Sequence, residues 1–267
     1  MLIKSDDLER LVRDIFHADG CSAGESARIA RYLVSANLAG HDSHGVLRIP
    51  RYLEWKREGV LVPDRHLAVL ADGDAFALVD GCHGFGQTIA PEAVRMGIAR
   101  AKDHGVAVIA LRRSGHLGRV GEWAEMAASD GLASVHFVNV AGSRLVAPFG
   151  GTERRLSTAP FAAGLPLESS PPIILDFATA LVAEGKVMVA ASGGPALPPD
   201  ALVEPDGSLT GDPAAFYGAT GVASLTVPVP LGLLPAALDV VVEPPVNLST
   251  GTLTVAQDET GSHRQAA

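Results

Sequence analysis

The chain has 267 residues, of which 47% are apolar and 19% charged, so it can bury a sizeable core as one large domain or two modest ones. Thirty acidic against 21 basic residues give a formal net charge of −9, and no cluster of Lys or Arg could follow a phosphate backbone, which argues against a nucleic-acid partner. The N-terminus shows no signal-peptide pattern and no apolar stretch reaches about 20 residues, so we expect a cytoplasmic protein with no membrane partner. Cys21 and Cys82 stand in no CxxC pattern and are expected to be free thiols.

Residues 5–59 carry the apolar spacing of helices. The first helix is expected to begin at Ser5 as its cap, and its apolar residues fall on one face. Ser22 and Glu25 have the spacing of a capping box for a second helix. That helix is expected to end at Gly40, where a left-handed residue is usually needed.

The stretch HDSHGVLRIPRY, residues 41–52, follows that stop. Pro50 fits the first turn of a third helix at residues 50–58, which leaves a connector or single turn before it. His41 and His44 could share one face of a helix, but the stretch lacks the second half of any zinc motif, so no metal site is expected. Two interpretations stay open: the histidines cap helix ends or fill polar gaps, or one of them is a catalytic acid.

Strands and helices alternate further along the chain. LAVLADGDAFALVDG predicts two strands joined at Asp72-Gly73, and TIAPEAVRMGIARAKDHG predicts a helix. VAVIAL, LASVHFVNV and PPIILDFAT have the pattern of strands, while EWAEMAA and ALVAEGKVMVAA have that of helices. Residues 193–213 are expected to form a loop rich in Pro, Gly and Asp. The alternation predicts an α/β fold with a mixed sheet behind an N-terminal helical segment.

A second histidine, His116, lies in the loop RRSGHLGRVGEW between a predicted strand and a predicted helix, where open α/β sheets place ligands. Gly115, Gly118 and Gly121 would let the backbone approach a neighbour closely. The spacing matches neither a Walker A loop nor a dinucleotide fingerprint, and GCHGFG at residues 81–86 does not match either. The glycines alone therefore do not indicate a phosphate site.

Three side chains together have the chemistry to act on a 2-oxo acid. A histidine can carry a proton near neutral pH, and an arginine can hold a carboxylate with two hydrogen bonds. Reduction of a 2-oxo acid requires both functions. His44, Arg48 and His116 would supply them, and the sequence does not decide which histidine donates the proton.

The chain carries, in this order, the motifs HDSHGVLRIPRYLEWKREG, DGCHGFGQTIAPEAV, RRSGHLGRVGEWAEMA, VAPFGG and LDFATALVAEGK. Over residues 5–213 they resemble the malate/L-lactate dehydrogenase family, which is unrelated to the Rossmann-type lactate dehydrogenases. Relatives in that family include ureidoglycolate, sulfolactate and diketogulonate oxidoreductases and cyclic-imine carboxylate reductases. The resemblance implies a homodimeric oxidoreductase that uses NAD or NADP, binds it on a sheet of its own type, and interconverts a small 2-oxo acid and a 2-hydroxy acid.

The resemblance also implies roles for individual residues. His44 matches the family's acid/base histidine, with Ser43 beside it as a substrate-binding residue. Arg48 matches the arginine that faces the substrate carboxylate, and His116 matches a second catalytic histidine. The positions that would contact the cofactor are Asn139, Val140, Asp176, Phe177, Ala178 and Thr179. The alternative for these six residues is plain packing at strand ends.

The chain departs from the family pattern at three places. Residues 157–160 read S-T-A-P where the family has a G-T-N-P turn, and Ala180 replaces the last serine of the D-M-A-T-S segment. The glycine-rich His-Lys-Gly segment, whose lysine would help to hold the nucleotide, is absent after residue 218.

We therefore expect three regions. Residues 1–70 would form an N-terminal helical region, residues 71–218 an α/β domain for nucleotide and substrate, and residues 219–267 an atypical Pro-rich tail. The tail holds no lysine and a single arginine, Arg264, and only edge strands tolerate so much proline. It is expected to be disordered or to come from a frameshifted or truncated gene.

Two rival hypotheses accompany the dehydrogenase interpretation. The chain could be a catalytically inactive, truncated family member that retains dimerisation or ligand binding. It could also be a metal-dependent hydrolase that uses His41 and His44.

Overall fold

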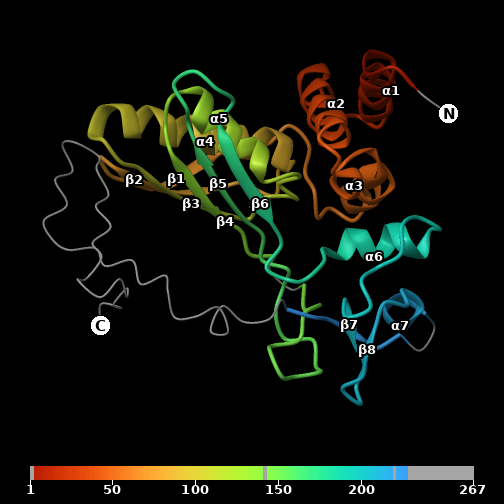
Figure 1. The fold of residues 1–267 in the computed structure, drawn as a ribbon. Helices are drawn as coiled ribbons and strands as arrows, with labels where there is room; N and C mark the ends of the chain where they lie inside the picture. Colours follow the sequence, from red (N-terminus) through yellow and green to blue (C-terminus); the bar gives the residue numbers. More distant parts are fainter. Residues whose placement is uncertain (1–2, 141–142, 219–220, 228–267) are drawn as a thin grey trace, which may run out of the picture.

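The computed structural model describes residues 3–140, 143–218 and 221–227, and Figure 1 shows how their helices and strands are arranged. The helices are α1 (Ser5–Ala18), α2 (Ala23–Leu38), α3 (Ile49–Arg57), α4 (Gly86–His104), α5 (Gly121–Ser129), α6 (Glu184–Ala191) and α7 (Ala214–Tyr217). Two 3-10 turns, η1 (Asp42–His44) and η2 (Val46–Arg48), join α2 to α3. The strands are β1 (Ala68–Asp72), β2 (Phe76–Asp80), β3 (Val108–Arg112), β4 (Ser134–Phe137), β5 (Phe161–Leu165), β6 (Ile173–Phe177), β7 (Leu202–Val203), β8 (Leu209–Thr210) and β9 (Ser224–Leu225).

The three predicted N-terminal helices are confirmed as α1, α2 and α3. Val12 and Phe16 of α1, Leu33 of α2 and Tyr52 of α3 are buried in one shared core. Removing each such side chain from water stabilises the fold by about 1.5–3 kcal/mol. Gly40 follows α2 with φ 78°, the left-handed conformation expected of it.

The helix caps differ in part from the prediction. The predicted cap at Ser5 is wrong, because Lys4 is the extended N-cap residue and Ser5 already lies in the helix. Ser22 does cap α2, where its hydroxyl accepts a hydrogen bond from the backbone N–H of Glu25 at 3.2 Å. The return half of the capping box is missing, since the Glu25 carboxylate accepts from the backbone N–H of Asp64 instead.

Helices α4 and α5 pack on one face of the strands β2 to β6 (Figure 1). β1 and β2 form the predicted antiparallel hairpin, and β2 pairs with β3 in parallel, so this sheet is mixed. β4, β5 and β6 form a second, antiparallel sheet. The α/β class with a mixed sheet is confirmed, although the described strands divide into small sheets.

Some strands are not indicated by the sequence. β5 reads FAAGL, and its Ala and Gly residues have low strand propensity, yet it forms the centre of the β4–β5–β6 sheet. Residues 193–213, predicted to be a loop, include the two-residue strands β7 and β8. Strands this short give too few residues for an alternating pattern to be read.

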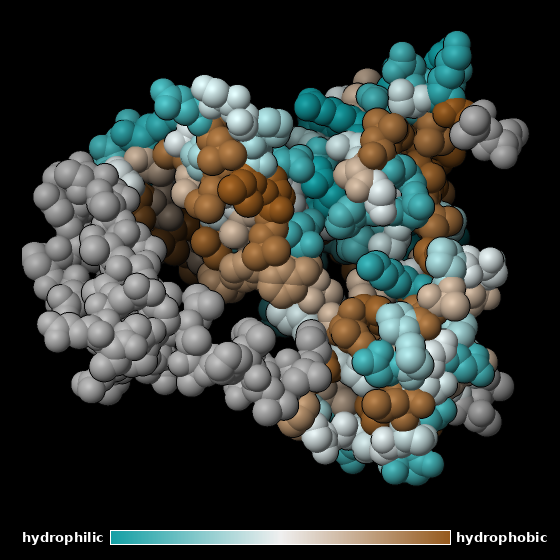
Figure 2. Space-filling model, viewed as in Figure 1, coloured by the Kyte–Doolittle hydropathy of each residue, from teal (hydrophilic) through white to brown (hydrophobic). Residues whose placement is uncertain are grey.

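The face of the β4–β5–β6 sheet that points away from α5 is apolar and exposed. Phe137 is 82% exposed and Phe177 is 45% exposed, whereas Ala162 on the opposite face is fully buried. The other large exposed side chains of these strands are Val135, Leu165, Ile173 and Leu175. Figure 2 shows apolar surface over this part of the molecule. Within the described chain, helices therefore cover this sheet on one face.

Residues 221–227 pack against the preceding part of the chain. β9 pairs with β7, and Ala223 and Leu225 are fully buried beside it. Of the predicted tail, residues 219–267, the predictions for residues 219–220 and 228–267 lie outside the described residues. Of the helices that are described, none combines the length and the apolar character needed to cross a membrane.

Candidate active site

The connector between α2 and α3 is held in a fixed shape by Asn37. Its side-chain oxygen accepts from the backbone N–H of Val46 at 2.9 Å, and its amide nitrogen donates to Asp42 at 2.5 Å. A Cβ at Gly45 would lie 2.1 Å from the Asn37 oxygen, so only glycine fits between them. The connector forms the predicted single turns, η1 and η2, and these carry His44 and Arg48.

Arg48 is anchored at one edge of its guanidinium. Nε donates to the backbone carbonyl of Ser43 at 2.6 Å, and the side chain is 13% exposed. Nη2 lies 3.8 Å from Oε2 of Glu184, and the other carboxylate oxygen, Oε1, accepts a hydrogen bond from the hydroxyl of Tyr217. A Cβ at Gly185 would lie 2.5 Å from Ser43 Cβ, so glycine lets the start of α6 approach the connector.

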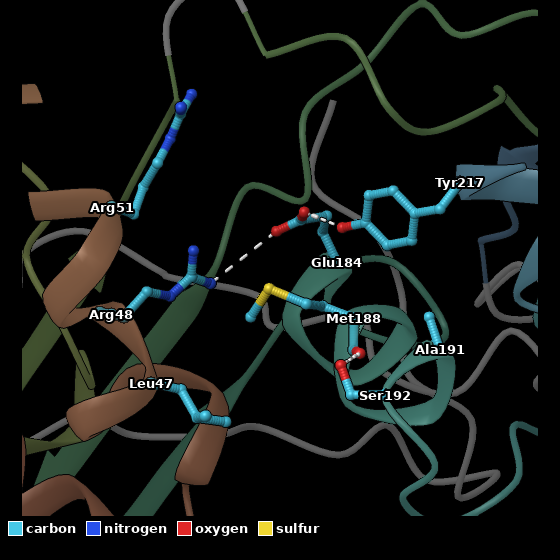
Figure 3. Close-up of a pocket in the computed structure, with 8 residues that line it drawn as sticks. All are labelled: Leu47, Arg48, Arg51, Glu184, Met188, Ala191, Ser192 and Tyr217. Carbon is cyan, nitrogen blue, oxygen red and sulfur yellow. Dashed lines mark hydrogen bonds and ion pairs between the residues drawn. The ribbon is translucent and has the colours of Figure 1, made fainter. Parts of the chain in front are cut away.

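A pocket of about 430 Å³ opens beside this guanidinium. Figure 3 shows Arg48 and Arg51 on one side of it and Glu184 with Tyr217 on the other. Leu47, Met188, Ala191 and Ser192 complete the lining. The pocket therefore combines two cations, one carboxylate and apolar walls, and its size suits a small organic anion.

The structure brings His44 and His116 together. Their rings stack with centroids 5.4 Å apart and 22° between the planes. Nδ1 of His44 lies 2.9 Å from the Ser43 hydroxyl, and Nδ1 of His116 lies 2.7 Å from the hydroxyl of Tyr52. His41 is also close, with its ring centroid 6.2 Å from that of His44.

Burial and the nearby arginine keep both rings neutral at pH 7. The pKa of His44 is lowered to about 4, chiefly by burial and then by the charges of Arg48 and His41. Burial, then Arg48 and then His44 hold the pKa of His116 well below its usual value. Since one guanidinium lowers the pKa of both rings, Arg48 is within electrostatic reach of the whole pair.

Two glycine-containing loops pack against each other below His116. A Cβ at Gly86 would lie 2.1 Å from the carbonyl oxygen of His116, and one at Gly115 would lie 2.7 Å from that of Gly84. The buried carboxylate of Asp80 accepts hydrogen bonds from residues of both loops, Cys82 N at 2.8 Å and Arg113 Nε at 2.8 Å. The close approach that the sequence predicted is thus between two loops of the protein itself.

The predicted cofactor residues gather at one edge of the β4–β5–β6 sheet. Phe137, Phe161 and Phe177 are aligned across the three strands, so the residues that follow β4 and β6 meet those that precede β5. The Ser157 hydroxyl donates to Asn139 Oδ1 at 3.1 Å, and Thr179 donates twice to the carbonyl of Thr158 at 3.0 Å. The other members of the set at this edge are Val140, Phe177 and Ala178.

Asp176 links this edge to the His116 loop. Its carboxylate accepts from the backbone N–H of Gly121 at 2.8 Å, the first residue of α5. A carboxylate at this position is stabilised by the positive end of the helix. The two predicted sets of residues, acid/base and cofactor-contacting, therefore lie on connected segments.

Metal ligands do not gather here. Among residues 3–140, 143–218 and 221–227, no three His, Cys, Asp or Glu side chains are placed so that they could hold a metal ion together. Cys21 and Cys82 are free thiols, as expected.

Sequence reasoning missed four residues of this site. Tyr52 lies four positions after Arg48, so helical spacing could have placed the two on one face. The Gln87 side-chain amide donates to the Tyr52 hydroxyl at 3.0 Å, and like Thr88 it is a polar residue buried at the start of α4. No sequence pattern indicates Glu184 or Tyr217, because Glu184 reaches Arg48, and Tyr217 reaches Glu184, only through the packing of α6 and α7.

Comparison with known proteins gives a consistent result. The model of a family described as malate/L-lactate dehydrogenase matches residues 3–234. Hydroxycarboxylate dehydrogenase B of Escherichia coli is 40% identical over 209 residues, which are 78% of this chain and 58% of that protein. L-lactate dehydrogenase of Cupriavidus necator is 33% identical over 220 residues, which are 82% of this chain and 63% of that protein. The chain thus spans less than two thirds of the length of these curated relatives.

A solved structure agrees with this assignment. Sulfolactate dehydrogenase from Methanocaldococcus jannaschii superposes with a TM-score of 0.75 at 30% identity, covering 90% of this chain and 70% of its own. Family model, sequence relatives and structure all point to the same group. The chain belongs to the malate/L-lactate dehydrogenase family.

Proposed function

We propose that this chain provides the substrate-binding and acid/base residues of an NAD(P)-dependent oxidoreductase that interconverts a small 2-oxo acid and a 2-hydroxy acid. The observation that carries the proposal is one guanidinium, Arg48, that lines the pocket and also lowers the pKa of two stacked, neutral imidazoles, His44 and His116. The names of the relatives, which are hydroxycarboxylate, L-lactate and sulfolactate dehydrogenases, support the same substrate class.

Arg48 would hold the substrate carboxylate. Nε is occupied by the Ser43 carbonyl, but the two terminal nitrogens keep donors that can grip a carboxylate as a pair. An incoming carboxylate would replace the weak contact with Glu184 at 3.8 Å. The Arg48 side chain is only 13% exposed, so solvent screens this ion pair less than it would on the open surface.

The imidazoles would act on the oxygen at carbon 2 of the substrate. In the reductive direction this carbon gains a hydride and its oxygen gains a proton, and both are lost again in the oxidative direction. A bound nicotinamide supplies or accepts the hydride. His44 and His116 would stabilise the developing charge on the oxygen and exchange its proton.

The sheet edge fits a nicotinamide nucleotide in its chemistry. Asn139 and Thr179 are exposed there and keep hydrogen-bonding capacity beyond their bonds to Ser157 and Thr158. Amide and hydroxyl groups of this kind suit the carboxamide and ribose hydroxyls of such a cofactor. Asn139, Val140 and residues 176–179 would form this contact, either with NAD or with NADP. Family membership further supports a cytoplasmic homodimer.

The proposal is tested by measuring NADH and NADPH oxidation with pyruvate, oxaloacetate and other small 2-oxo acids. The Arg48→Ala variant should raise KM roughly 10- to 100-fold, because hydrogen bonds between charged groups contribute about 1.5–3 kcal/mol. Arg57→Ala, which removes an exposed arginine at the far end of the following helix α3, serves as the matched control and should leave KM unchanged. NADH fluorescence is titrated in parallel. Binding without turnover would support the inactive alternative, and unchanged kinetics in Arg48→Ala would exclude the carboxylate clamp.

A further inference from the structure

A chain of hydrogen bonds ends on His116. The buried amide of Gln87 donates through Nε2 to the Tyr52 hydroxyl at 3.0 Å, and that hydroxyl lies 2.7 Å from His116 Nδ1. Gln87 and Tyr52 are each only 1% exposed, so water does not compete for these bonds. Burial also raises the pKa of Tyr52 to about 12, which keeps its proton on the phenol.

The direction in which these hydrogen bonds run fixes which nitrogen of His116 carries the proton. Because the Tyr52 oxygen accepts from Gln87, its own O–H is free to point at His116 Nδ1, which then must be the unprotonated nitrogen. The proton of the neutral ring is left on Nε2. This nitrogen has no hydrogen-bond partner in the part of the chain that the structure describes, and it is not among the fully buried unpaired atoms there, so it keeps some accessible surface and a free donor.

The opposite direction is less favourable. If His116 Nδ1 carried the proton, a buried donor would lose its partner: either the Tyr52 O–H, because its oxygen would accept from both Gln87 and His116, or both N–H groups of a Gln87 amide turned to accept from Tyr52. In the observed orientation the amide oxygen, Oε1, is the buried atom left without a partner. Unpaired acceptors are better tolerated in protein interiors than unpaired N–H donors. The buried amide therefore favours one direction.

His44 differs in this respect. Its Nδ1 meets the Ser43 hydroxyl, which has no second described hydrogen bond to fix its direction and can rotate to donate or to accept. His44 can therefore keep its proton on either nitrogen. The two stacked imidazoles therefore differ in whether their tautomer is fixed by hydrogen bonds.

We propose that Gln87 and Tyr52 are positioning residues that hold His116 as the Nε2–H tautomer, so that His116 donates a fixed hydrogen bond to the substrate oxygen while His44 exchanges the proton. A neutral imidazole in this form stabilises an oxyanion without transferring its own proton. The division of roles rests on the proposed function, but the tautomer of His116 does not.

The tautomer is measured by nitrogen NMR on the full-length chain labelled with ¹⁵N-histidine, without ligand at neutral pH. His116→Gln identifies the signals of His116. In the wild type the Nε2–H form should exceed the Nδ1–H form by about tenfold or more, since one buried hydrogen bond separates them. Tyr52→Phe should lower this ratio by about tenfold, and Gln87→Met, which keeps the volume of the side chain, should lower it as well.

Ser43→Ala is the matched control, because it removes the hydroxyl that contacts Nδ1 of His44, the other ring of the pair. It should change the His44 signals and leave the tautomer ratio of His116 as in the wild type. A wild-type His116 protonated on Nδ1, or an unchanged ratio in both Tyr52→Phe and Gln87→Met, would overturn the inference. A fixed Nε2–H tautomer in a chain that neither binds NADH nor reduces any 2-oxo acid would overturn the proposed function alone.

If the chain is active, the kinetics give a second readout. Gln87→Met should lower kcat by about tenfold with little change in KM, because the fixed hydrogen bond acts on the developing oxyanion and not on the carboxylate. A rise in KM with unchanged kcat would contradict the assigned role. Gln87→Glu should restore part of kcat, and do so best at low pH, where a protonated carboxyl can donate to Tyr52.

Discussion

The ring of His44 lies stacked on the ring of His116, 5.4 Å between centroids, although one belongs to a helical connector and the other to a loop after β3. In the described chain neither ring pairs with a carboxylate, and the guanidinium of Arg48 lowers the pKa of both. Burial and a cation thus hold the pair neutral. Its protonation should depend on pH and on whatever neutralises Arg48.

The first consequence is a loss of stability in mild acid. The pKa of His44 is about 4 in the folded chain and about 6.5 when unfolded, so the unfolded chain binds more protons between these values. Stability should therefore fall as pH drops from 6.5 to 4, by roughly 3 kcal/mol from this residue. Urea unfolding at several pH values should show a smaller loss in His44→Gln. His104→Gln, on an exposed site in the last turn of α4, should behave as the wild type.

The second consequence is a link between Arg48 and the histidine pKa. Removing the cation in Arg48→Gln should raise the pKa of His44, because Arg48 is the largest charge that lowers it. Burial remains in the variant, so the value should stay below that of a free histidine. NMR titration of the histidine ring protons measures the shift. A pKa that stays in place, or one that moves equally in Arg57→Gln, would contradict the link.

A third prediction concerns Glu184, which lies against the proposed carboxylate clamp. Its carboxylate is 3.8 Å from Arg48 Nη2 and must give way to an anionic substrate (Figure 3). Glu184→Gln should lower KM for 2-oxo acids by about 1.5- to 5-fold, the range of a partly exposed ion pair. Steady-state kinetics with wild type, Glu184→Gln and the exposed control Glu153→Gln measures the effect. An increase in KM would show that Glu184 helps to bind the substrate.

A fourth prediction tests the close contact between α6 and the connector. Inside a helix, Gly→Ala usually stabilises by about 0.5–1 kcal/mol. In Gly185→Ala the new Cβ would lie 2.5 Å from Ser43 Cβ, so we expect a loss of about 1–3 kcal/mol instead. Gly24→Ala in α2, where the nearest atom is 3.5 Å away, should show the usual gain. Urea unfolding of both variants compares them directly.

The sequence predicted the site where local patterns determine it. Helix signals around residues 5–59 correctly left His44 and Arg48 on a connector, and motif matches paired them with His116, which the structure brings into ring contact. Chain geometry could have added Tyr52 from its spacing to Arg48. Glu184 is different, since its contact with Arg48 depends on the docking of α6, which no local pattern encodes.

The same limit applies to the sheet. The hairpin at Asp72-Gly73 has a turn signal and was predictable. β5 has none, because its FAAGL sequence becomes a strand only between two partners that supply its hydrogen bonds. The residues expected to contact a cofactor could therefore be picked out from motif resemblance, whereas strand patterns gave no sign that they meet at one edge of a sheet.

The turn before β5 offers a last prediction, on stability. Ala159 has φ 32°, in the left-handed region that costs a side chain with a Cβ roughly 1–2 kcal/mol. Asn and Gly tolerate this conformation, and asparagine is the residue of the family's G-T-N-P turn at this place. The turn is also held by its neighbour, since the Ala159 N–H donates to the Ser157 hydroxyl at 3.2 Å. Ala159→Asn should therefore keep the turn and raise the unfolding free energy by about 1 kcal/mol. Ala159→Val, which is β-branched, should lower it, and equal stability of all three forms would show that the turn relaxes without strain.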